Sequence, residues 1–69
     1  MSDEEMAKVC GGLTAMQVGR LLASYGNGQP VSNRGGAVNA LYAAGLTDRK
    51  GRITEQGREL CKWIGQRLT

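Results

Sequence analysis

Apolar residues recur at helical spacing in four stretches of this 69-residue chain. In the first, between Met6 and Leu13, they stand at i, i+3, i+4 and i+7, as on one face of a helix. Ser2 and Glu5 form a capping-box pattern before this stretch, and Gly11-Gly12 follows it. The pattern predicts a helix that starts after Ser2 and ends at the glycine pair.

A second helix is predicted to begin at the capping box formed by Thr14 and Gln17 and to end at the turn-forming residues 26–30. A third is predicted to open at Ser32 or Asn33 and to close at Gly45. Their inward faces are predicted to hold Val18, Leu21, Leu22 and Tyr25 in the second helix, and Val38, Leu41 and Tyr42 in the third.

Residues 46–54 predict a tight β-hairpin. Asp48 suits the first position of a type I turn, and Gly51 suits the left-handed residue that follows it in a three-residue loop. Leu46 and Ile53 can both point inward from the two arms. A last helix is predicted to start at Thr54, so the fold class is mainly α with a small β-hairpin.

From Leu13 to Leu60 the pattern resembles bacterial winged-helix regulators of the MarR-like kind. The resemblance rests on LYAAGL at 41–46 and ITEQGREL at 53–60, which flank a basic hairpin. It implies one winged helix-turn-helix domain over residues 1–69, with a three-helix core, a wing and a C-terminal helix. Residues 26–31 form a longer turn than is usual there, and long dimerisation helices are lacking, which indicates a reduced module.

Net charge is +3, and it is unevenly distributed. Residues 1–33 hold two basic and three acidic residues, whereas residues 34–69 hold seven basic and three acidic ones. A nucleic-acid or acidic partner is therefore expected on the second half. The acidic N-terminus does not read as a signal peptide, and no apolar run is long enough for a membrane span, so a cytoplasmic location is expected.

The resemblance implies that the third helix enters the major groove of DNA and that the wing lies on the backbone. Asn33, Arg34 and Asn39 are the polar residues of that helix, and Asn and Arg side chains can read adenine and guanine. Asn33 could equally cap the helix and Arg34 could be solvated, whereas Asn39 has no capping role. The predicted phosphate contacts lie at the hairpin tip: Arg49, Lys50 and Arg52.

Two further features leave alternatives open. Gly35 and Gly36 fall in the first turns of the third helix, where each glycine costs up to about 1 kcal/mol relative to alanine. They could allow a close approach to a phosphate or, as we favour, tight packing against the second helix near Gly19. Trp63 could complete the core against the first helix or contact a partner, and the core position is favoured.

Nothing in the sequence indicates an enzyme. Histidine is absent, and no phosphate-cradling or nucleophile motif occurs. Cys10 and Cys61 are expected to be reduced core residues, so no cofactor, metal or disulfide is predicted. The leading hypothesis is a bacterial or phage transcriptional regulator that binds double-stranded DNA. A homodimer remains open, and the alternative is an interaction module that binds a host or replication protein.

Overall fold

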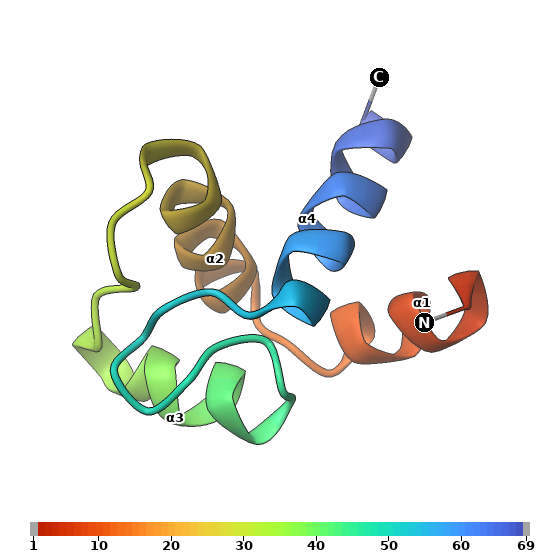
Figure 1. Cartoon of the computed structure of the whole chain (residues 1–69). Coiled ribbons are helices and arrows are strands. Elements are labelled where there is room, and N and C mark those ends of the chain that lie inside the picture. The colour runs from red at the N-terminus through yellow and green to blue at the C-terminus, as the bar shows by residue number, and fades with distance from the viewer. Residues whose placement is uncertain (1, 69) are drawn as a thin grey trace.

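Helices account for all the regular secondary structure in the computed structural model, which describes residues 2–68 except the side chain of Leu68 (Figure 1). The elements are α1 (Asp3–Gly11), α2 (Ala15–Asn27), the 3₁₀ helix η1 (Arg34–Gly36), α3 (Ala37–Ala43) and α4 (Glu55–Leu68). α2 contacts both α3 and α4, and α1 packs against α4. A long connection from α3 to α4 crosses the front of the molecule in Figure 1.

Three of the four predicted helix starts are confirmed by their caps. The Ser2 hydroxyl accepts a hydrogen bond from the Glu5 N–H at 3.3 Å, and Thr14 and Gln17 form a reciprocal capping box. Thr54 caps α4, because its hydroxyl accepts a hydrogen bond from the Gly57 N–H at 3.2 Å. Each cap satisfies a backbone donor that has no partner within its own helix.

The predicted β-hairpin, and with it the winged-helix fold, is wrong. Residues 2–68 contain no strand, only an isolated antiparallel bridge between Thr47 and Ile53. The reason is the short length of the two arms. Gly45 already has a left-handed backbone (φ +78°) at the end of α3, and Thr54 already caps α4. Only Leu46 and Thr47 on one side of the turn, and Ile53 on the other, remain for the arms, which is too few for a ladder.

Residues 48–52, called the basic loop below, keep the predicted turn chemistry without the strands. The Asp48 carboxylate accepts hydrogen bonds from the N–H groups of Lys50 and Arg52, each at 2.9 Å. The Gly51 N–H donates to the Asp48 carbonyl at 3.1 Å, and Gly51 has the left-handed backbone (φ +85°) that glycine adopts most easily. The basic loop is therefore a fixed turn whose three basic residues are exposed.

The third helix begins later than predicted. Gly35 and Gly36 have φ values of +68° and +74°, which an α-helix does not accommodate, so α3 starts only at Ala37. The tight-packing explanation for these glycines is wrong: a Cβ on Gly35 would meet nothing within 4 Å, and one on Gly36 only the Asn39 amide at 3.9 Å. The two glycines are needed for their backbone conformation.

The core lies where α2, α3, α4 and the connection between α3 and α4 meet. Leu21, Leu41 and Leu60 are fully buried there. Cys61 is also buried, and burial raises the pKa of its thiol to about 11, so the thiol stays protonated at neutral pH. Tyr25 and Tyr42 were predicted to face inward but are 39% and 44% exposed. Both cysteines are free thiols; Cys10 is half-buried against the core.

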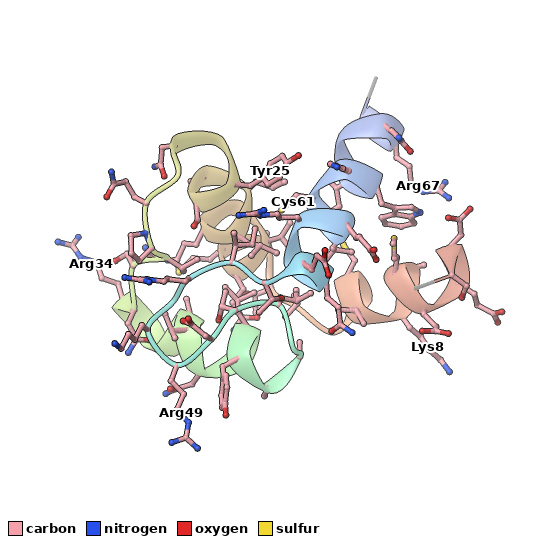
Figure 2. All side chains as sticks on the ribbon, viewed as in Figure 1. Lys8, Tyr25, Arg34, Arg49, Cys61 and Arg67 are labelled. Atoms are coloured by element: carbon pink, nitrogen blue, oxygen red, sulfur yellow. The ribbon has the colours of Figure 1, made fainter. Side chains whose placement is uncertain are left out.

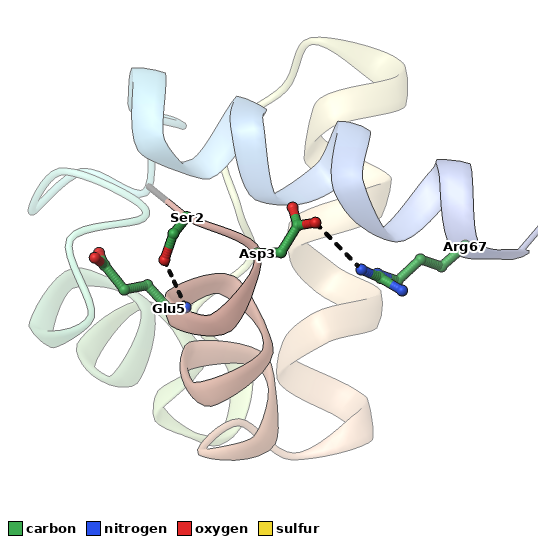
Figure 3. Close-up of polar contacts among 4 residues, drawn as sticks. All are labelled: Ser2, Asp3, Glu5 and Arg67. Atoms are coloured by element: carbon green, nitrogen blue, oxygen red, sulfur yellow. Dashed lines mark hydrogen bonds and ion pairs between the residues drawn. The ribbon is translucent and has the colours of Figure 1, made fainter.

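Trp63, on α4, packs against the edge of this core. Its ring is half-buried, and the guanidinium of Arg67 lies 4.3 Å from the ring centroid. Arg67 also pairs with Asp3 of α1 at 3.7 Å. Both charged groups are largely exposed, so this ion pair (Figure 3) contributes little to stability.

Two threonines in the connection between α3 and α4 are expected to change stability in opposite directions when replaced by valine. Thr47 is 2% exposed, and its hydroxyl has no hydrogen-bond partner within the described part of the chain. The Thr54 hydroxyl donates to the Gly45 carbonyl at 2.7 Å and caps α4. We expect Thr47→Val to stabilise the fold by about 1 kcal/mol and Thr54→Val to destabilise it by about 1–3 kcal/mol. Urea unfolding measures both, and a destabilised Thr47→Val would contradict the account of its hydroxyl.

Candidate functional site

An open groove lies between the C-terminal end of α2 and the N-terminal half of α4. Its volume is about 780 Å³, within the roughly 300–1,000 Å³ of ligand clefts. Four chain segments form its walls: the end of α2, the connection after it, the end of the basic loop and α4. Its lining residues are Ser24, Tyr25, Gly28, Gln29, Pro30, Arg52, Ile53, Arg58 and Lys62.

Three cations line this groove, and none of its lining residues is acidic. Arg58 and Lys62 are four residues apart on α4, so they share one helix face, and Arg52 reaches the groove from the basic loop. All three residues are exposed. Cations that converge from two elements on a groove with no acidic lining residue create a local positive potential that attracts an anion.

The wall formed by residues 28–30 is held in place by hydrogen bonds. The buried Ser24 hydroxyl donates to the Gln29 carbonyl, and the Gln29 N–H donates to the Asn27 side-chain oxygen at 2.8 Å. Gly28 ends α2 with a left-handed backbone, and its N–H donates to the Ser24 carbonyl at 2.9 Å. This wall therefore needs little ordering when a ligand binds.

Arg52 is positioned by a second set of backbone bonds. Its N–H donates to the Asp48 carboxylate and its carbonyl accepts from the Asp48 N–H, each at 2.9 Å. The Val31 N–H donates to the Gly51 carbonyl at 2.8 Å, which ties the basic loop to the chain that leaves the 28–30 wall. Two walls of the groove are thus linked to each other.

Tyr25 supplies the aromatic surface of the groove. Figure 2 shows it near the end of α2, on the side that faces α4. With 39% of its surface exposed, the ring is available for contact with a ligand. An exposed aromatic ring beside arginine and lysine side chains is the combination that proteins use to bind nucleotides.

The residues predicted on the third helix do not form one cluster. The Asn33 side-chain oxygen accepts a hydrogen bond from the Val38 N–H at 3.1 Å, so it satisfies a donor in the first turn of α3, although Gly36 occupies the N-cap position. Arg34 is exposed in η1, and Asn39 is exposed on α3. Figure 2 shows Arg34 and Arg49 at different edges of the molecule.

Arg49 is held against α3 and away from the groove. Its Nε donates to the Tyr42 hydroxyl at 3.2 Å, and its guanidinium lies 5.6 Å from the centroid of the same ring. Lys50 is exposed beside it. Of the three predicted phosphate-contacting residues, only Arg52 lines the groove.

The sequence reasoning missed Arg58, Lys62 and Tyr25 as candidate site residues. The i, i+4 spacing of the two cations was visible in the sequence and indicates a shared helix face. Tyr25 was assigned to the core because it continues the apolar spacing of α2. Only the packing of α2 against α4 shows that the three residues line one groove.

Comparison with known proteins adds no assignment. No protein-family model, curated protein or solved structure matches this chain. The resemblance to MarR-like regulators therefore rests on its residue pattern alone. Across residues 2–68, no group of three or more His, Cys, Asp or Glu residues is placed to hold a metal ion. No helix of that described part has the length and apolar character needed to cross a membrane.

Proposed function

We propose that this protein binds DNA through the phosphate backbone, using the basic loop and the groove beside it. The observation that carries the proposal is the groove itself, where Arg52, Arg58 and Lys62 converge without an acidic lining residue. Arg49 and Lys50 are two further exposed cations of the basic loop, outside the groove. Phosphate contacts of this kind supply most of the affinity of non-specific DNA binding.

The exposed surface of α3 favours backbone contact over base reading. α3 has seven residues, and its exposed polar side chains are Asn39 and Tyr42. Tyr42 already accepts a hydrogen bond from Arg49. A recognition helix usually reads bases with several side chains, each of which contacts a base edge. Asn39 is therefore the single candidate on α3 for a base contact, and we propose binding with little sequence preference.

Binding to a random-sequence duplex across a salt series tests this proposal. If the basic loop and the groove neutralise about 3–5 phosphates, log K falls with log salt with a slope of roughly −3 to −5. Fluorescence anisotropy with a labelled duplex measures the slope. No binding at low salt would overturn the proposal and would favour an acidic protein partner instead.

Two exposed residues provide a matched pair of variants for the same assay. Lys50→Ala removes a cation from the basic loop and is expected to weaken binding to all sequences equally, with a slope about one unit smaller. Asn39→Ala removes no charge and is expected to leave the slope unchanged. An equal change of slope in both variants would contradict phosphate contact by Lys50, and a changed preference in Asn39→Ala would indicate that α3 reads bases.

A further inference from the structure

The groove has a feature that contact with duplex phosphates does not require. Phosphate contact needs only cations, yet the same groove exposes the ring of Tyr25. Paired bases in a duplex are stacked on their neighbours, so their faces cannot reach an aromatic side chain. The faces of unpaired bases are free to stack on such a ring.

We infer that the groove is a binding site for an unpaired nucleotide, whose base stacks on Tyr25 and whose phosphate contacts Arg52, Arg58 and Lys62. This inference rests on the proposed DNA binding and makes it more specific: it predicts preference for a single strand over a duplex. The volume of about 780 Å³ falls within the range of clefts that hold small organic ligands.

The arrangement of the walls supports this occupant. The 28–30 wall is fixed by Ser24, Asn27 and Gly28, and Arg52 is fixed by Asp48. The cations line the groove from the basic loop and from α4, and Tyr25 lines it from α2. A ligand that carries both an aromatic face and a negative charge uses all of these groups, whereas an acidic peptide leaves the aromatic ring without a role.

Tyr42 serves as the internal comparison. It is 44% exposed, similar to Tyr25, and it also lies beside an arginine. It does not line the groove, and its hydroxyl and ring are both engaged with Arg49. A change at Tyr42 therefore reports the effect of losing an exposed tyrosine outside the groove.

The test compares three labelled probes by fluorescence anisotropy: an oligothymidylate, an abasic strand with the same number of phosphates, and a duplex. We expect the oligothymidylate to bind about 5- to 150-fold more tightly than the abasic strand. Tyr25→Ala is expected to abolish this ratio and Tyr25→Phe to preserve it. Tyr42→Ala is expected to leave the ratio unchanged.

The role of the cations is tested with Arg58→Ala and Lys62→Ala. Each variant is expected to lower the affinity for the oligothymidylate and for the abasic strand by the same factor. Fluorescence of Trp63, the single tryptophan, confirms that each variant is folded. Equal affinity of the wild-type protein for the two single strands, or a ratio that survives in Tyr25→Ala, would overturn the nucleotide site. Duplex binding with the expected salt slope would then leave the proposed function standing. Binding of polyglutamate with the same affinity as oligothymidylate would overturn the nucleotide site in favour of an acidic peptide.

Discussion

Gly57→Ala is expected to destabilise the protein by about 3 kcal/mol, although the same change inside a helix usually stabilises it by up to about 1 kcal/mol. Gly57 is buried in the first turns of α4. An added Cβ would overlap the Leu46 carbonyl oxygen and lie 2.7 Å from Cγ1 of Ile53. Non-bonded carbon atoms prefer separations of about 3.5–4.0 Å.

The neighbouring backbone cannot easily move to relieve this overlap. The Leu46 carbonyl accepts a hydrogen bond from the Thr54 N–H at 3.0 Å, and the Leu46 N–H donates to the Leu41 carbonyl at 2.9 Å. The Leu46 side chain is fully buried. A shift of Leu46 would therefore disturb both the end of α3 and the start of α4.

Gly65→Ala is the matched control, since Gly65 lies in the same helix and an added Cβ there would meet nothing within 4 Å. It is expected to stabilise the protein by up to about 1 kcal/mol. Urea unfolding followed by Trp63 fluorescence measures both variants. A domain of this size has only about 3–5 kcal/mol of stability, so Gly57→Ala is expected to retain at most about 2 kcal/mol and to be marginally stable. Stabilisation by Gly57→Ala would show that α4 does not pack this closely on residue 46.

Local signals in the sequence were enough to predict the starts and caps of three of the four helices. Ser2, Thr14 and Thr54 each cap a helix as predicted, because a cap depends only on residues up to three positions away. The turn at Asp48 and Gly51 also formed as predicted. The error lay in extending this turn into two strands, since strand length depended on where α3 ended and α4 began.

Predicting the start of α3 and the groove would have required information that the local sequence pattern does not contain. Gly35 and Gly36 fell within the stretch predicted as helix, and their left-handed backbone in the fold shows that the helix starts after them. Tyr25 and Arg58 are far apart in the sequence and line one groove because α2 packs against α4. No periodicity within a single helix could have predicted that they line the same groove.

Gly51→Ala is expected to destabilise the protein by about 3 kcal/mol, and Gly28→Ala by only about 1 kcal/mol. Both glycines have a left-handed backbone, with φ values of +85° and +71°. Alanine therefore introduces backbone strain at either position. At Gly28 an added Cβ would meet nothing within 4 Å, so strain is the whole cost.

At Gly51 a Cβ would also lie 2.8 Å from the Val31 carbonyl oxygen and 3.2 Å from the Val31 nitrogen. That nitrogen donates to the Gly51 carbonyl, the hydrogen bond that ties the basic loop to the chain after the 28–30 wall. Relief of the overlap would lengthen this bond and release the basic loop that positions Arg52. Urea unfolding of the two variants separates the cost of the overlap from the cost of strain. Equal losses would mean that strain alone operates and that the basic loop is not held against Val31.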